Sequence, residues 1–199
     1  MLQSGFVHAT ASKVLTFASL ASVMLFDGTT QDQLGLSVQH VGDPSQLWRL
    51  VTSQLFFSRP DAAFCAAIGF YNMRQVERQM GTSKFVAFAA FVSGVSALLQ
   101  LVVLSVFPKT FAGEEGAISS GPFALLFALY LVYWRWIPRR RRVVSTKLFG
   151  VVPITEKIMT YLFVSQCFLA GGLPSLVPSL SAIPAAAVYM AGVRACVRA

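Results

Sequence analysis

The sequence is poor in charged side chains. Only 12% of its 199 residues are Asp, Glu, Lys or Arg, against about 25% in an average soluble domain, while 55% are hydrophobic. The mean hydropathy is correspondingly high, at +0.64. This composition excludes a soluble globular protein, and the scattered Gly and Pro residues fit neither collagen nor a disordered chain. A multi-span membrane protein remains.

Cysteine and histidine are also scarce. Cys65, Cys167 and Cys196 all lie in apolar stretches, which suits small buried side chains and excludes a disulfide framework or a Cys/His metal cluster. The sequence therefore predicts no metal site and no cofactor. The net charge of +8 would suggest a nucleic-acid partner for a soluble chain, but here the position of the charges along the chain explains the excess, and no nucleic acid is expected.

Long uncharged stretches predict the membrane-spanning helices. They cover residues 14–26, 62–73, 85–108, 116–134 and 158–193, and a span needs about 20 apolar residues. Glycines and prolines between 171 and 178 divide the last stretch into two helices, at about 154–171 and 180–197. We therefore expect one all-α integral membrane domain over residues 1–199, with six transmembrane helices. A cleaved signal peptide over 1–25 is the alternative, although its apolar run after Lys13 is short.

The charges between these stretches predict the orientation. Thirteen of the 16 basic residues fall on one side of the membrane and three on the other, which also holds six of the eight acids. Because cytosolic loops carry the Lys and Arg excess, both termini are expected to be cytosolic. The first lumenal loop, about 28–60, is long. It contains Trp48 and Arg49 within an apolar segment, which favours a helix lying in the headgroup region over an ordinary solvated loop.

Four short patterns occur in order along the chain. Trp48 and Arg49 lie in "QLWRLVTSQLFF"; Glu77, Gly81 and Phe85 lie in "VERQMGTSKF". "SSGPFALLFALY" opens the fourth predicted helix, and Gly192 is a small residue in the sixth. Together they resemble the rhomboid superfamily, which includes the derlins, over about residues 10–197.

Within that superfamily, "FYNMRQVERQMGTSKF", "FALYLVYWRWIPR" and "PITEKIMTYL" are most similar to rhomboid-like pseudoproteases. These are endoplasmic-reticulum membrane proteins that usually carry a C-terminal ubiquitin-associated domain. The resemblance implies a six-helix rhomboid-like bundle. Because this chain ends at Ala199, we expect that bundle here without the ubiquitin-associated domain.

The same resemblance predicts that the chain is not an enzyme. In active rhomboids a serine at the start of the fourth helix is activated by a histidine on the sixth. Ser120, followed by Gly121, occupies the serine position, but the base position falls at Ala185, and no His, Lys, Asp or Glu occurs from Ile158 onward. Ser120 and Pro122 are instead interpreted as a helix start, with the serine as its cap.

One further pair of residues has two interpretations. Glu77 and Arg78 could form a functional ion pair, although a role in holding the turn between the second and third helices is favoured.

The function that the resemblance implies is protein quality control in the endoplasmic reticulum. A non-catalytic adaptor would bind membrane-protein clients or UBX-type adaptors and link them to a ubiquitin ligase and an AAA-ATPase. We expect the clients to contact the face between the second and fifth helices, through Asn72, Ser165 and Gln166. A Golgi or endosomal membrane is the alternative location. An active intramembrane serine protease, which would need a base, and a small transporter, which would need polar groups in mid-span, are the alternative functions.

Overall fold

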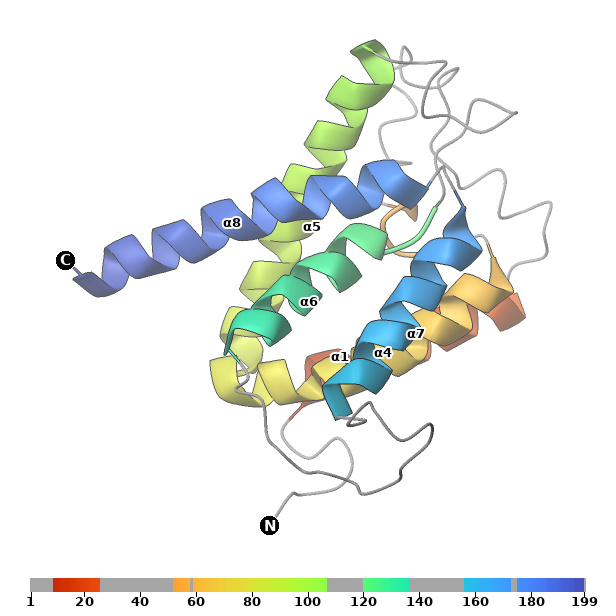
Figure 1. Ribbon diagram of the computed structural model, residues 1–199, viewed down its shortest axis with the longest axis horizontal. Helices are drawn as coiled ribbons and strands as arrows, with labels where there is room; N and C mark the ends of the chain where they lie inside the picture. The colour runs from red at the N-terminus through yellow and green to blue at the C-terminus, as the bar shows by residue number, and fades with distance from the viewer. Residues whose placement is uncertain are drawn as a thin grey trace, which may run out of the picture.

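The computed structural model describes residues 9–25, 52–57, 59–106, 120–136, 156–172 and 175–198. Within these residues the fold is all-helical, with six helices and no strand (Figure 1). The expected all-α architecture is thus confirmed. The helices are α1 (Thr10–Leu25), α4 (Pro60–Met80), α5 (Thr82–Val106), α6 (Phe123–Trp136), α7 (Glu156–Gly171) and α8 (Leu176–Arg198).

The helix ends follow from local chemistry. Pro60 occupies the first turn of α4, where its missing N–H is not needed, and Gly81 ends that helix with a φ of 85°. The fourth helix begins at Phe123, later than the uncharged stretch from 116 suggested, because Gly121 and Pro122 are not helical. The sixth begins at Leu176, earlier than predicted, because Pro178 fits within a first helical turn.

Consecutive helices run antiparallel. Glu77, near the end of α4, is bonded to Ser12 at the start of α1, and Cys167, late in α7, is bonded to Ala62 at the start of α4. The Tyr130 ring of α6 meets Tyr161 near the start of α7. The starts of α1, α5 and α7 and the ends of α4, α6 and α8 therefore share one end of the bundle. We call this end the basic end, because its charged side chains include Lys13, Arg74, Arg78, Lys84 and Arg135.

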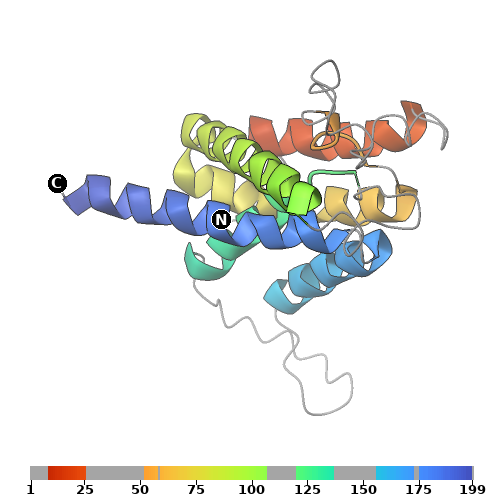
Figure 2. The ribbon, with the colours of Figure 1, turned by 90° about the horizontal axis from the view of Figure 1, so that it is seen from above.

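Two helices form the centre of the bundle. α4 lies between α1 and α7, and α6 packs against α4 and α8 (Figures 1 and 2). Small residues make the close approach possible: a Cβ added at Gly69 of α4 would lie 2.8 Å from the Leu126 side chain of α6. The C-terminal half of α8 extends beyond the other helices (Figures 1 and 2).

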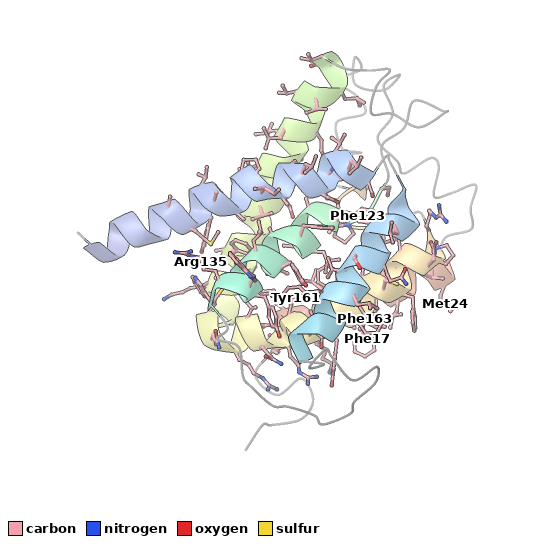
Figure 3. The ribbon with its side chains drawn as sticks, viewed as in Figure 1. Phe17, Met24, Phe123, Arg135, Tyr161 and Phe163 are labelled. Atoms are coloured by element: carbon pink, nitrogen blue, oxygen red, sulfur yellow. The ribbon has the colours of Figure 1, made fainter. Side chains whose placement is uncertain are left out.

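The outer surface is strongly apolar. Met24 of α1 is 85% exposed and Leu169 of α7 is 70% exposed, and Phe17 also points outward (Figure 3). An apolar surface of this kind has to be covered by lipid or by protein. Among the described residues, α5 is the one helix long and apolar enough to cross a membrane by length and composition. Shorter apolar helices occur at Thr10–Met24, Phe123–Trp136 and Leu176–Gly192.

Candidate functional site

Ser120, the residue at the rhomboid nucleophile position, is buried directly before α6. Its hydroxyl donates a hydrogen bond to the backbone carbonyl of Phe56, at 2.6 Å. The hydroxyl therefore joins two segments 64 residues apart. The sequence suggested that Ser120 caps the fourth helix. In the structure its hydroxyl instead donates to Phe56, in the segment 52–57.

Gly121 reinforces the same junction. Its amide donates to the carbonyl of Ser53 at 2.7 Å. A Cβ at Gly121 would lie 2.6 Å from the Phe57 ring, and its φ of +145° is rarely adopted by other residues. The Phe57 ring in turn meets Phe123 edge-on, with centroids 5.3 Å apart. We call residues 52–57 together with Ser120 and Gly121 the serine junction.

Within the described residues, the Ser120 hydroxyl is bonded to a peptide carbonyl and not to a base. Ala185, at the base position on α8, is buried and carries only a methyl group. The two histidines of the chain, His8 and His40, lie outside the described residues. A hydroxyl whose proton is shared with a peptide carbonyl is not activated as a nucleophile, because a carbonyl is too weak a base. The geometry of the junction serves to hold backbone segments together.

A second polar pair lies deep in the bundle. The Gln54 side-chain amide, from the serine junction, donates to the Gln100 carbonyl oxygen of α5 at 2.8 Å. Both side chains are buried, and the Gln100 amide nitrogen has no protein partner within the described residues. Gln100 lies inside the uncharged stretch 85–108, and nothing in the sequence identifies Gln54 as its partner.

Glu77 forms the centre of the basic end. Its side chain is fully buried, and its carboxylate accepts hydrogen bonds from the backbone amides of Ala11 (2.9 Å) and Ser12 (2.7 Å). The Thr82 hydroxyl donates to it as well, at 3.0 Å. All three bonds are donated to the Glu77 carboxylate, which is the pattern expected of the ionised form. Its negative charge lies at the N-terminus of α1, where the helix dipole is positive. The capping of α1 was not expected from the sequence.

The other residues of the "VERQMGTSKF" pattern lie around Glu77. Gly81 donates its amide to the Glu77 carbonyl at 2.8 Å and accepts from the Phe85 amide at 3.0 Å, which connects α4 to α5 through a tight turn. The Phe85 side chain is fully buried, and Arg78 is partly buried. These contacts make the turn a rigid junction of α1, α4 and α5.

The residues predicted to contact clients lie on α4 and α7. Thr160, Val164 and Cys167 form the buried side of α7, and the Cys167 thiol donates to the Ala62 carbonyl of α4 at 3.5 Å. Ser165 and Gln166 are exposed, on the side of α7 that turns away from this contact. Asn72 of α4 is partly buried. The structure therefore does not bring Asn72 together with the other two in one cleft between the helices.

Trp48, Arg49 and Gly192 are the three other predicted positions. Trp48 and Arg49, the residues expected at the membrane interface, lie outside the described residues. Gly192 of α8 is exposed, and a Cβ added there would meet no atom within 4 Å, so the described residues hold no packing partner for it.

In the part of the chain that the structure describes, no three His, Cys, Asp or Glu residues come close enough to share a metal ion.

Comparison with known sequences identifies relatives. The family described as "Eukaryotic integral membrane protein (DUF1751)" matches residues 9–193. Rhomboid-like protein 18 of Arabidopsis thaliana is 29% identical over 94% of this chain and 63% of its own length. Ubiquitin-associated domain-containing protein 2 is 29% identical in Homo sapiens, over 63% of this chain, and 30% identical in Gallus gallus, over 61%.

These relatives are longer than the matched region. This chain spans 36% of the human protein and 34% of the chicken protein, so it covers less than two thirds of each curated relative described above. No solved structure matches it. The resemblance to rhomboid-like membrane proteins, and to those named for a ubiquitin-associated domain, is confirmed.

Proposed function

We propose that this chain, which belongs to the DUF1751 family of eukaryotic integral membrane proteins, is a non-catalytic rhomboid-like adaptor. It binds membrane segments of other proteins and connects them to ubiquitin-dependent degradation. The observation that carries the proposal is the 2.6 Å hydrogen bond from the Ser120 hydroxyl to the Phe56 carbonyl, with Ala185 at the base position. Because the serine is engaged in a structural contact, the rhomboid-like fold is used for binding.

The partners proposed are membrane-protein clients and UBX-type adaptors. Through them the chain reaches a ubiquitin ligase and an AAA-ATPase in the endoplasmic-reticulum membrane. The name of the ubiquitin-associated domain-containing relatives supports a connection with ubiquitin for that family branch.

The topology proposed is six spans with cytosolic termini and a long lumenal first loop. The alternating direction of the six helices supports it, because each chain passage returns to the opposite end of the bundle. The basic end, with Lys13, Arg78 and Arg135, would face the cytosol. The Arg59–Asp61 ion pair (2.9 Å) lies at the other end, at the start of α4.

The client contact proposed is the exposed side of α7. Ser165 and Gln166 lie there among exposed apolar side chains that include Leu162 and Leu169. A polar side chain on an otherwise apolar helix face can hydrogen-bond to a neighbouring transmembrane helix, and such bonds contribute about 0.6 kcal/mol each. Weak contacts of this size suit an adaptor that has to release its clients.

Site-specific photo-crosslinking tests this surface. A benzoylphenylalanine at Gln166 should capture membrane proteins or UBX-type adaptors, and the same probe at Leu98, which is 64% exposed on α5, is the matched control. At least one membrane protein captured from Gln166 and not from Leu98 should persist longer in cells that lack the chain. Equal capture at both positions, or unchanged turnover of every captured protein, would overturn the adaptor function.

Complementation separates the adaptor from a protease. Ser120→Ala should restore client turnover as well as the wild-type chain does, and the purified protein should not react with a fluorophosphonate probe. Fluorophosphonate labelling of the wild-type chain that Ser120→Ala abolishes would identify Ser120 as a nucleophile.

A further inference from the structure

A groove separates the ends of α6 and α8. It has a volume of about 300 Å³, at the lower end of the range for ligand sites. Three of its residues come from the last turns of α6 and three from the extended half of α8: Leu131, Trp134, Arg135, Ala187, Met190 and Ala191. Leu131, Trp134 and Arg135 place the groove at the basic end, where Figure 3 shows Arg135 at the end of α6.

The groove combines a cation with hydrocarbon. Arg135 is the one charged residue of its lining, and within the described residues this guanidinium has no hydrogen bond or ion pair. The remaining lining is apolar, and Trp134 is 59% exposed beside it. Tryptophan and arginine at a helix end are typical of the depth at which lipid headgroups meet acyl chains.

The surrounding charge also favours an anion. Lys13, Arg74, Arg78 and Lys84 lie at the same end of the bundle. Glu77, an acid of this end, is fully buried and held by three hydrogen bonds, so it does not face a ligand in the groove. Glu156 is at the start of α7, whereas α6 and α8 line the groove.

We infer that this groove binds one acidic phospholipid. Its phosphate or serine headgroup would pair with Arg135, and an acyl chain would lie along Ala187 and Ala191, whose small side chains leave the α8 side of the groove open. In the proposed topology the basic end lies in the cytosolic leaflet, which contains such lipids, and basic pockets between transmembrane helices on that side bind anionic headgroups. The inference concerns lipid and does not depend on the adaptor function.

Tryptophan quenching tests the inference at the groove itself. A chain in which Trp48 and Trp136 are replaced by phenylalanine keeps Trp134 as its single tryptophan. It is reconstituted in phosphatidylcholine vesicles that contain the same mole fraction of either dibrominated phosphatidylserine or dibrominated phosphatidylcholine. The apparent association constant should be about five times larger for phosphatidylserine, the factor that one arginine near an acidic lipid supplies.

Two pairs of variants locate the effect. Arg135→Gln should bring the ratio of the two constants to about one, while Lys84→Gln, which removes a charge from the same end but outside the groove, should leave it unchanged. Ala191→Phe should reduce quenching by both lipids, while Val188→Phe, at a 59% exposed position of α8 outside the lining, should not. For Arg135→Gln and Lys84→Gln the ratio compares two lipids on one variant, so altered fluorescence of Trp134 cancels.

A second measurement uses the unmodified chain. Native mass spectrometry with equal amounts of phosphatidylserine and phosphatidylcholine should show one preferred phosphatidylserine adduct, which Arg135→Gln abolishes. Equal quenching by the two lipids, or a preference that Lys84→Gln removes as readily as Arg135→Gln, would overturn the inference. Quenching by neither lipid, as expected if protein fills the groove, would also overturn it.

Discussion

The Glu77 carboxylate lies 2.7 Å from the backbone nitrogen of Ser12, so a side chain near the end of α4 caps the start of α1. The same carboxylate accepts from the Ala11 amide and from the Thr82 hydroxyl at the start of α5. Three helices therefore meet at one buried anion. The first turn of a helix leaves amides without intrahelical partners, and Glu77 satisfies two of them.

Replacing Glu77 with glutamine should destabilise the fold strongly. The glutamine NH₂ group would face one of the backbone amides that now donate, which leaves buried donors without an acceptor. Hydrogen bonds to a charged group contribute about 1.5–3 kcal/mol, so the free energy of unfolding should fall by about 2 kcal/mol. Unfolding in detergent, followed by circular dichroism, measures this change.

Asp61→Asn is the matched control on the same helix. Its carboxylate is about half exposed and pairs with an exposed Arg59, so the loss should stay below about 1 kcal/mol. Equal losses for Glu77→Gln and Asp61→Asn would contradict the capping role.

Gly121→Ala should destabilise the serine junction. The new Cβ would lie 2.6 Å from the Phe57 ring, on a backbone with φ of +145°. Strain and overpacking each cost about 1–3 kcal/mol, so the unfolding midpoint should fall clearly. Gly94→Ala is the control: nothing lies within 4 Å of its added Cβ, and alanine in a helix should leave stability unchanged or raise it by up to about 1 kcal/mol. Comparable losses at both glycines would contradict the close contact.

Glycosylation mapping tests the six-span topology. α5 ends at Val106 and α6 begins at Phe123, both at the end of the bundle opposite the basic end. An Asn-x-Ser acceptor placed at 108–117 should therefore be modified in microsomes, and one placed at 138–150 should not. An acceptor at 30–45, in the predicted lumenal loop, is the positive control. Modification at 138–150 would contradict the orientation.

The sequence predicted the helices well because their signal is local. Apolar stretches and the Gly and Pro residues between them locate six helices to within a few residues at most of their ends. The end of α4, at Met80, lies seven residues beyond the uncharged stretch that ends at 73, and the starts of α6 and α8 differ as well. Those two starts depend on the conformation of Gly121 and on the place of Pro178 in a first turn. The hydropathy of the sequence reveals neither the conformation of Gly121 nor the place of Pro178 in the helix.

The sites were less accessible to sequence reasoning because their contacts are distant along the chain. Ser120 bonds to a carbonyl 64 residues away, and Glu77 bonds to Ser12 across 65 residues. A motif identifies which residues to examine, as it did for Ser120 and Glu77. It does not identify a backbone partner, because every residue carries the same carbonyl and amide groups. Burial likewise decided that Ser165 and Gln166 face outward from α7.

The Gln54–Gln100 pair allows a test of energetic coupling inside the bundle. Gln100→Leu should leave the Gln54 amide without its acceptor, and Gln54→Leu should leave both polar ends of Gln100 without a protein partner among the described residues. Each single change therefore leaves a buried polar group unsatisfied and should lower stability. The double change removes all four polar groups and should cost less than the sum of the two.

A double-mutant cycle measures this coupling. Interhelical hydrogen bonds in membrane proteins give about 0.6 kcal/mol on average and up to about 1.7 kcal/mol, so the coupling should fall within this range. Ser105→Ala on α5 is the control partner, because its hydroxyl is exposed and bonds to Val102 of its own helix. Ser105→Ala and Gln54→Leu should be additive. Additivity of Gln54→Leu and Gln100→Leu would show that the 2.8 Å contact does not fix residues 52–57 against α5.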